Sequence, residues 1–241
     1  MLSRVDLHCH YLPGVDDGVR TLDESQRVLK GLKALGYDEV VATPHIRSGM
    51  FENRKPGLVR AFTELNDVLG DTAELPKRSL SAEHYFDDVF VGLIATKEAL
   101  PYPGEHAVLV EFHYDLWPRG IERQFFKLEI AGLRPLIAHP ERYRELEQRS
   151  DALETLTDAG AFTLLDLMAL VGKYGERSRR VAERLLEEGL YDAACSDTHR
   201  PDDVDLVAKG IHRLAELVGE EECESMLGET PRAILDGTYD A

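Results

Sequence analysis

The chain has 241 residues, of which 43% are hydrophobic and 30% charged, so it can bury a sizeable core and wholesale disorder is excluded. Its 28 Lys and Arg residues face 45 Asp and Glu residues, which gives a formal charge of −17. Because this charge repels a polyanion and no basic run extends beyond Arg177, Arg179 and Arg180, we expect no nucleic-acid partner.

The N-terminus and the cysteines indicate the compartment. We find no signal peptide after Met1, and no apolar run reaches the roughly 18 residues that cross a bilayer, so we expect a cytoplasmic protein without membrane insertion. The three cysteines are an odd number with no paired spacing, which fits a reducing compartment.

Apolar, β-rich runs predict seven strands along the chain. The predicted strands span Val5 to His8, Glu39 to Thr43, Arg78 to Ala82, Ala107 to Phe112, Pro135 to Ala138, Phe162 to Leu165 and Asp192 to Ser196.

Amphipathic stretches with helical periodicity alternate with these strands, and several end on a glycine, as at Gly36 and Gly189. The alternation predicts an α/β fold with a parallel sheet and helices outside it, and the absence of a linker predicts a single domain over 1–241. The predicted helices span Asp23 to Leu35, Leu58 to Leu69, Ile121 to Ala131, Ala152 to Ala159, Arg179 to Glu188 and Val204 to Val218.

Side chains suited to metal binding stand at or just beyond the end of every predicted strand. The spacings from His8 onward are 37, 38, 28, 28, 27 and 31 residues, about one strand-and-helix unit each. In a parallel barrel the carboxyl ends of all strands meet on one face, so these groups are expected to converge and to bind Mn, Fe or Zn. They are His8 and His10, His45, Glu83, Glu111, His139, Asp166, and Asp197 with His199.

Each of these residues alone is more often a hydrogen-bonded capping group than a ligand. The pair His8 and His10 is the strongest local signal, because alternation along a strand places both imidazoles on one side. Cys9 then points the other way and is expected to be a small buried hydrophobe.

Other catalytic chemistries find no support in the sequence. None of the cysteines has an arginine six positions later, as a cysteine phosphatase requires; Cys195 has Pro201 there, with Arg200 one position short. We find neither a Gly-x-Ser-x-Gly elbow nor a phosphate-binding Gly-x-x-x-x-Gly-Lys loop.

The strand-end motifs, read in order, resemble those of one family, the metal-dependent protein tyrosine phosphatases of the polymerase and histidinol phosphatase (PHP) superfamily, of the bacterial capsule and exopolysaccharide type. The resemblance extends from Val5 to about Arg232. The motifs that indicate this branch are Val15-Asp16-Asp17-Gly18, Gly49-Met50-Phe51-Glu52 and His139-Pro140-Glu141-Arg142-Tyr143, beside the more general Asp6-Leu7-His8-Cys9-His10, Thr43-Pro44-His45 and Ser196-Asp197-Thr198-His199.

The resemblance implies a distorted seven-stranded TIM-like barrel, the PHP fold, with three divalent metal ions. Mn is the expected metal, with Fe, Zn and Mg as alternatives. Carried over by position, the first ion is held by His8, His10, Glu83 and Asp197, the second by Glu83, Glu111 and His139, and the third by Asp17, His45 and His199.

The resemblance also assigns residues to the substrate. Arg142 resembles the arginine that holds the phosphate, and a helical turn beginning at Pro140 would place it over the rim of the site, whereas the alternative is a surface arginine paired with Glu141 or Glu145. Arg47 and Arg200 are further candidates for substrate binding, and Arg142, Asp197 and His199 are expected to be catalytic. Asp166 stands where the family has Asn, so its role is left open, and the loop from His113 to Pro118 is expected to border the mouth of the site.

The expected reaction is hydrolysis of phosphotyrosine, by attack of a hydroxide that bridges two metal ions, on a protein such as the tail of a bacterial tyrosine kinase that regulates polysaccharide export. The nearest alternative is a PHP phosphatase of a small metabolite such as histidinol phosphate. A metal-dependent hydrolase of C–N bonds normally has a carboxylated lysine at a strand end, and this sequence has no lysine there. A non-catalytic metal-binding scaffold would not need nine side chains suited to metal binding on one face. A PHP proofreading module for DNA is disfavoured by the net negative charge. The oligomeric state is left open.

Overall fold

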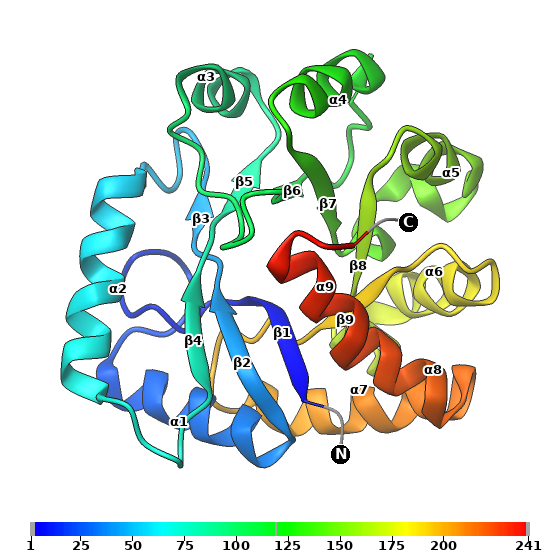
Figure 1. Cartoon of the computed structure of the whole chain (residues 1–241). Helices are drawn as coiled ribbons and strands as arrows, with labels where there is room; N and C mark the ends of the chain where they lie inside the picture. The colour runs from blue at the N-terminus through cyan, green and yellow to red at the C-terminus, as the bar shows by residue number, and fades with distance from the viewer. Residues whose placement is uncertain (1–2, 119, 240–241) are drawn as a thin grey trace.

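The computed structural model describes residues 3–118 and 120–239, in which strands and helices alternate along the chain (Figure 1). The strand segments are β1 (Arg4–Cys9), β2 (Tyr37–Ala42), β3 (His45–Ile46), β4 (Lys77–Leu80), β5 (Glu83–Tyr85), β6 (Ala107–Glu111), β7 (Arg134–Ala138), β8 (Phe162–Asp166) and β9 (Ala193–Cys195). The helices are α1 (Leu22–Ala34), α2 (Lys55–Leu69), α3 (Asp88–Thr96), α4 (Ile121–Ile130), α5 (Asp151–Asp158), α6 (Gly175–Glu187), α7 (Asp203–Val218), α8 (Glu220–Glu224) and α9 (Thr230–Asp236).

All strand pairings are parallel. One sheet has the order β1, β2, β4 and the other has the order β3, β5, β6, β7, β8, β9. The first and last strands also meet, because the Asp197 backbone N–H donates to the His8 carbonyl and the His10 N–H donates to the Thr198 carbonyl, each at 2.9 Å. The fold is thus the TIM-like α/β architecture that the sequence predicted.

The two sheets arise because two of the seven predicted strands are interrupted. β2 ends before Pro44 and resumes as β3, since proline has no N–H to donate to a neighbouring strand. β4 stops at Leu80 and resumes as β5 after Ala82, where the Glu83 N–H donates to the Pro44 carbonyl at 3.1 Å. The predicted strand over Arg78 to Ala82 was therefore wrong in its last two residues, and the chain turns Glu83 inward at this break.

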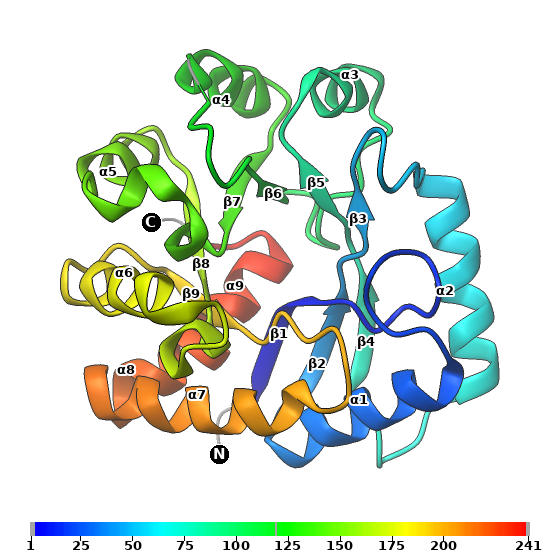
Figure 2. The ribbon, with the colours of Figure 1, turned by 180° about the vertical axis from the view of Figure 1, so that it is seen from behind.

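The six predicted helices are present, with ends shifted by at most a few residues, and they lie outside the strands (Figures 1 and 2). Helix α3 and the C-terminal pair α8 and α9 were not predicted from the sequence. No helix within the described ranges is both long enough and apolar enough to cross a membrane.

The buried core has two layers. One lies between the strands and the outer helices, and the other fills the space inside the strands with side chains such as Leu7, Leu109, Leu136 and Leu164. Ile234 and Leu235 of α9 join this inner layer, so α9 closes the end of the barrel that faces the viewer in Figure 1.

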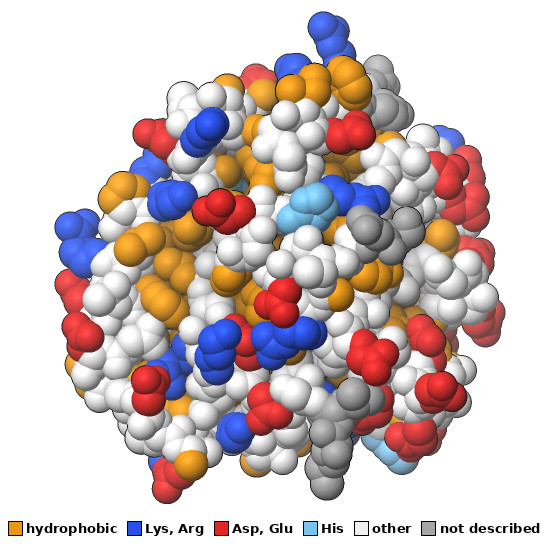
Figure 3. Space-filling view, viewed as in Figure 1, with side chains coloured by type: hydrophobic (Ala, Val, Ile, Leu, Met, Phe, Trp, Pro, Cys, Tyr) orange, Lys and Arg blue, Asp and Glu red, His pale blue; other side chains and the backbone are white. Residues whose placement is uncertain are grey.

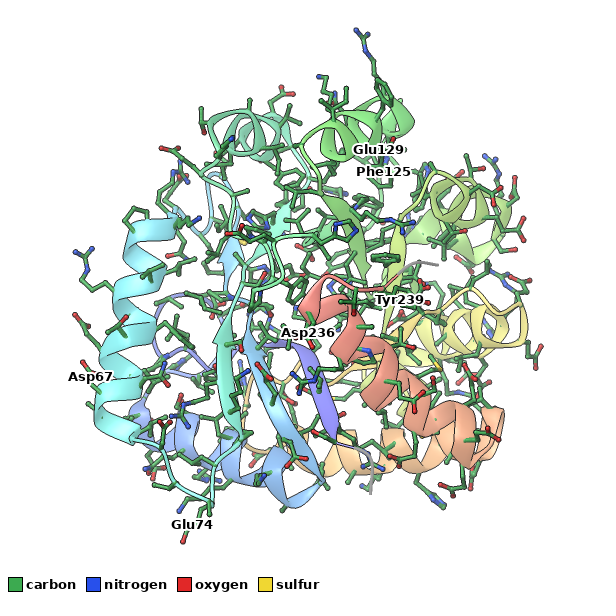
Figure 4. All side chains as sticks on the ribbon, viewed as in Figure 1. Asp67, Glu74, Phe125, Glu129, Asp236 and Tyr239 are labelled. Carbon is green, nitrogen blue, oxygen red and sulfur yellow. The ribbon has the colours of Figure 1, made fainter. Side chains whose placement is uncertain are left out.

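The C-terminal segment continues this closure. Tyr239 donates from its hydroxyl to Asp192 Oδ1 at 2.9 Å and packs its ring against Phe162 (Figure 4). Because α9 occupies this end, the opposite end, where the loops following β1 and β9 lie in front in Figure 2, is the face open to ligands.

Candidate active site

The carboxyl ends of the strands and the loops after them bring the nine residues predicted as metal ligands together in overlapping groups. We call these residues metal-type residues and the groups metal-type groups. In each group the potential ligand atoms lie within 4.8 Å of one another. The groups are His8, His10 and Asp197; His8, Glu83 and His139; His45, Glu83 and Glu111; and His10, Asp17, His45 and His199. All nine residues predicted as ligands belong to at least one of them.

Glu83 lies at the centre of this arrangement because the break between β4 and β5 turns it inward. Its Oε2 is 3.3 Å from His8 Nε2 and 2.9 Å from His45 Nδ1, while its Oε1 is 3.0 Å from His139 Nε2. The two oxygens of this buried carboxylate therefore face different groups, as a bridging role requires.

The pair predicted from alternation along β1 is close. His8 Nε2 and His10 Nε2 are 3.1 Å apart, and Asp197 Oδ1 is 3.3 Å from the former and 3.4 Å from the latter. Asp16, which belongs to a quoted motif but had no predicted role of its own, hydrogen-bonds His10 Nδ1 through its Oδ2 at 2.8 Å, so it fixes the ring and leaves Nε2 to face the group.

The Asp16-Asp17-Gly18 turn supplies the third group. Asp17 Oδ1 lies 3.4 Å from His45 Nε2 and 3.6 Å from His199 Nε2. The turn requires glycine at position 18, because a Cβ there would lie 2.3 Å from the carbonyl oxygen of His10. Asp17 is the most exposed of the three and lies at the open side of the group.

Two of these residues have a backbone conformation that non-glycine residues rarely adopt. His139 has a φ of 36° and Asp197 has a φ of 45°. Such conformations persist only where the surrounding structure holds them, and they concentrate at functional sites. In this conformation both side chains reach the metal-type groups.

The chemistry of these donors fits divalent cations. Asp197 Oδ1 and Glu111 Oε2 are buried and have no hydrogen-bond partner within the described residues. Burial and the charge of Glu83 raise the pKa of Glu111 to about 7, while burial lowers the pKa of His10 but Asp16 and Asp197 raise it to about 8. Carboxylates this close together raise the pKa of one another and of the neighbouring imidazoles. A divalent cation would supply the positive charge that stabilises the ionised carboxylates.

Arg142 reaches this cluster from the turn at Pro140–Arg142. Its Nη2 donates to Asp166 Oδ2 and to Asp197 Oδ2, and its guanidinium lies 3.7 Å from the centre of the Tyr174 ring. It is therefore not a surface arginine paired with Glu141 or Glu145. Its buried Nε has no partner within the described residues, so one donor remains for a ligand.

Asp166, whose role the sequence left open, is the partner of Arg142. Its second oxygen, Oδ1, accepts the Met168 N–H at 2.8 Å, and its own N–H donates to Glu141 Oε1 at 3.1 Å. Asp166 is absent from the four metal-type groups, so its contacts make it a positioning residue for the guanidinium.

The other two arginines differ in position. Arg200 is exposed and lines the cavity, whereas Arg47 lies over the Tyr85 ring with its Nη1 3.9 Å from Glu111 Oε2 and is not among the cavity-lining residues. Asp203 accepts the backbone N–H groups of His199 and Arg200 at 3.0 Å each, and so holds the loop that presents them.

The nine-residue cluster opens into a cavity of about 440 Å3. Its walls include residues that the sequence analysis did not assign: the rings of Tyr114 and Tyr174, and Lys173, whose Nζ is 2.8 Å from Asp203 Oδ1. Tyr114 belongs to the loop from His113 to Pro118 that was expected to border the mouth, and its ring centre is 6.1 Å from that of His139.

The cysteines lie apart from this chemistry. Cys9, Cys195 and Cys223 are free and buried, and burial raises the pKa of all three thiols. None of the three belongs to a metal-type group or to the cavity lining. The described structure therefore gives no support to thiolate chemistry, and the expectation that the cysteines are not catalytic stays a prediction.

Comparison with known proteins identifies the family. Residues 4–236 match the family described as "Capsular polysaccharide synthesis, CpsB/CapC". The chain belongs to the CpsB/CapC family. It is 30% identical over 197 residues to tyrosine-protein phosphatase YwqE of Bacillus subtilis, covering 81% of this chain and 77% of that protein.

A second relative is tyrosine-protein phosphatase CpsB of Streptococcus pneumoniae, 25% identical over 237 residues, with 96% of this chain and 98% of that protein covered. A solved structure described as YwqE and CpsB, "unique metal-dependent tyrosine phosphatases", superimposes with a TM-score of 0.89 at 27% identity, covering 98% of this chain and 96% of that chain.

More distant structures share the fold alone. The phosphotriesterase homology protein from Escherichia coli matches with a TM-score of 0.62 at 13% identity, covering 95% of this chain and 97% of that chain. The CpsB/CapC chain thus has the TIM-like architecture of a broader set of hydrolases, and its membership of one branch rests on the closer matches.

Proposed function

We propose that this CpsB/CapC chain is a metal-dependent phosphatase that removes phosphate from phosphotyrosine in a protein. The observation that carries the proposal is a cluster of nine metal-type side chains that opens into a cavity also lined by Arg142, Tyr114 and Tyr174. The names of its relatives, tyrosine-protein phosphatases CpsB and YwqE, point to the same reaction.

Three ions, with Mn as the proposed metal, are supported by the grouping of the donors. The first would be held by His8, His10, Glu83 and Asp197; the second by Glu83, Glu111 and His139; the third by Asp17, His45 and His199. Imidazole and carboxylate donors without a thiolate are the set that Mn, Fe and Zn accept. When bound, such ions attract the phosphate oxygens and lower the pKa of water, which makes a nucleophile available near neutral pH.

The residues of the chain supply orientation. Arg142 is proposed to bind a phosphate oxygen through its free Nε, while Asp166 and the Tyr174 ring keep the guanidinium in place. Asp197 and His199 line the same cavity and are proposed as catalytic, because Asp197 contacts Arg142 and His199 Nδ1 lies 3.5 Å from Asp197 Oδ1. Arg200 at the rim is a proposed contact to the substrate, and Arg47 would need to move to reach it.

The walls of the cavity favour an aromatic substrate. Tyr114 is 40% exposed and lines the cavity beside His139, so its ring is available to pack against a phenyl group. A phenolate, whose parent pKa is about 10, also leaves more readily than an alkoxide and depends less on a general acid.

The proposed substrate is a phosphotyrosyl protein such as the tail of a bacterial tyrosine kinase, in keeping with the polysaccharide-synthesis family. We propose one PHP phosphoesterase domain over 1–241, whose first two and last two residues lie outside the described structure, and a cytoplasmic location. The charge of −17 disfavours nucleic acid as an alternative partner.

Turnover of a phosphotyrosyl peptide and of histidinol phosphate by the Mn-loaded protein tests the proposal. We expect kcat/KM for the peptide to exceed that for histidinol phosphate by about a hundredfold, a difference of about 2.7 kcal/mol in transition-state binding. A preference for histidinol phosphate would assign the site to small metabolites, and no turnover of either substrate would leave a metal-binding scaffold.

A further inference from the structure

A second cavity, larger than the candidate active site, lies between α3 and α4. Its volume is about 790 Å3, and its floor is apolar, with Phe86, Phe90, Ile94 and Leu128 among its lining residues. The two helices are neighbours in the outer ring, and hydrophobic side chains are visible between them (Figures 1 and 3). A hollow of this size and composition is typical of a binding site.

The charge around this α3–α4 groove is opposite to that of the whole molecule. Lys55, Lys97 and Lys127 line it, against Glu105 as the one acidic residue among the described lining positions. In a chain with a net charge of −17, three lysines around an apolar floor form a local positive region. Such a region attracts an acidic ligand that also carries apolar side chains.

Two groove residues are held in a strained conformation. Lys97, the residue that follows α3 and caps its C-terminus, has a φ of 60°, and Glu105 has a φ of 54°. Among the described non-glycine residues, the other positive φ values belong to His139 and Asp197 of the candidate active site. Glycine would adopt this left-handed conformation at the end of α3 at a lower free-energy cost than lysine. The strained position therefore carries an amine at the edge of the groove.

Gln124, a lining residue of the groove, has an unpartnered polar atom. Its Oε1 is buried and has no hydrogen-bond partner within the described residues, although Gln124 lines the cavity. A buried amide oxygen without a partner is costly, and a donor from a ligand would satisfy it. The backbone N–H groups of an extended peptide are such donors, whereas a lipid acyl chain has none.

The groove is continuous with the elements of the active site. Phe86 follows directly after β5, which begins at Glu83, and its N–H donates to the Glu111 carbonyl at 2.8 Å. Lys55 begins α2 on the same side of the barrel, whereas Leu133 and Glu105 precede β7 and β6 at the opposite ends of the strands. A ligand lying along the groove would therefore extend from the rim of the active site down the outer wall.

We propose that the α3–α4 groove docks an extended acidic and apolar segment of the same phosphotyrosyl protein whose phosphate is removed at the metal cluster. This inference rests on the proposed function. The acidic residues of the segment pair with Lys97 and Lys127, its apolar side chains pack on Phe90 and Ile94, and its backbone donates to Gln124. Docking in this groove raises the local concentration of phosphotyrosine at the active site without altering the chemistry.

The test compares two substrates. One is a short phosphotyrosyl peptide, and the other is the same peptide joined to a segment of alternating Asp and Leu through Gly/Ser linkers of about 4 to 12 residues, which span roughly 11 to 19 Å. We expect the joined substrate to have a KM about tenfold lower with kcat unchanged.

Two variants localise the effect. Lys97→Glu combined with Lys127→Glu should abolish the tenfold gain, and Ala95→Trp, which fills the groove, should do the same. The matched control is Lys30→Glu combined with Lys209→Glu, which changes the charge equally at exposed positions on α1 and α7 and should keep the gain. Turnover of the short peptide should be equal in all of these proteins, which shows that they are folded and that the proposed phosphatase activity is intact.

The unphosphorylated Asp/Leu segment, carrying a fluorescent label, gives a direct reading of docking. Its binding should weaken in the two groove variants and in high salt, and remain in the control. A joined substrate with no advantage at any linker length would overturn docking while leaving the phosphatase proposal intact if the short peptide is turned over. Binding of anionic lipid vesicles that depends on Lys97 and Lys127, with no binding of the segment, would overturn it in favour of a membrane surface.

Discussion

At the residue scale, the candidate site depends on one carboxylate more than on any other group. Glu83 faces His8, His45 and His139 at once, at 2.9 to 3.3 Å, and is almost fully buried. A group that contacts three imidazoles from three strands joins the separate groups into one centre. Loss of Glu83 should therefore affect more than one ion.

We predict that Glu83→Ala loses about two of three bound ions and abolishes phosphatase activity while the barrel stays folded, because the carboxylate bridges two sites but belongs to no hydrophobic cluster. Native mass spectrometry measures the ions, and circular dichroism checks the fold. Asp166→Ala is the matched control, since Asp166 is an equally buried carboxylate outside the metal-type groups and should keep all ions. Full metal content in Glu83→Ala would show that the bridging assignment is wrong.

In the proposed function, Arg142 is the residue that separates phosphate chemistry from other metal-dependent hydrolysis. We predict that Arg142→Lys lowers kcat/KM for a phosphotyrosyl peptide by about tenfold or more, or about 1.4 kcal/mol, with metal content unchanged. The ammonium keeps the charge but cannot hold Asp166, stack on Tyr174 and offer a further N–H in one plane. Kinetics equal to wild type would limit Arg142 to a structural role.

The sequence located eight of the nine metal-type residues because they occupy the ends of strands, where topology alone brings them together. Asp17, in the loop after β1, was assigned only through the family resemblance. The sequence could not locate Tyr174, which precedes α6, or Asp203, which begins α7, because packing places these two helix starts at the cavity. For Tyr114 the position of its loop after β6 was the available signal. The contact between Arg142, in the turn after β7, and Asp166, the last residue of β8, has no signature along the chain.

At the element scale, the missed helices have compositions that disguise them. The α3 sequence, from Asp88 to Thr96, is short and rich in valine and isoleucine, which favour strands. The C-terminal segment contains Gly228 and Pro231, and a wider π turn over Ser225–Glu229 separates α8 from α9. Both segments are helical because tertiary packing outweighs these local preferences.

The placement of α9 against the loop before β6 allows a sharp test of this packing. A Cβ at Gly104 would lie 2.5 Å from the backbone C of Asp236 and the N of Gly237, too close for any side chain. We predict that Gly104→Ala displaces α9 and lowers the free energy of unfolding by about 1 to 3 kcal/mol.

The control for this prediction is Gly57→Ala in α2, where nothing lies within 4 Å of an added Cβ. Alanine should raise stability there by about 0.5 to 1 kcal/mol, because it loses less backbone entropy in a helix. Thermal unfolding of both variants provides the measurement. If Gly104→Ala is as stable as wild type, α9 does not close the barrel as described.

At the scale of the whole molecule, the two ends of the barrel have opposite roles. The end covered by α9 is filled with apolar side chains, including Ile234 and Leu235, and the other end holds carboxylates and imidazoles buried in close contact. Buried like charges destabilise a fold unless they are compensated. The apolar end therefore stabilises the fold, and the end that holds the ionisable side chains requires bound cations for stability.

This asymmetry predicts that metal ions stabilise the protein and are required for activity, whereas the thiols are not. A ligand that binds the folded state stabilises it by about 2.7 kcal/mol at a hundredfold excess over its dissociation constant. For a chain of this size, Tm should then rise by about 5 to 11 °C for each independent site. Chelation should remove both the stabilisation and the activity, and Mn should restore them.

Alkylation under native conditions should change neither the stability nor the activity, because Cys9, Cys195 and Cys223 are buried and their raised pKa values keep them protonated. Loss of activity on alkylation, with the ions still bound and Tm unchanged, would show that a cysteine takes part in catalysis and that the metal cluster does not act alone.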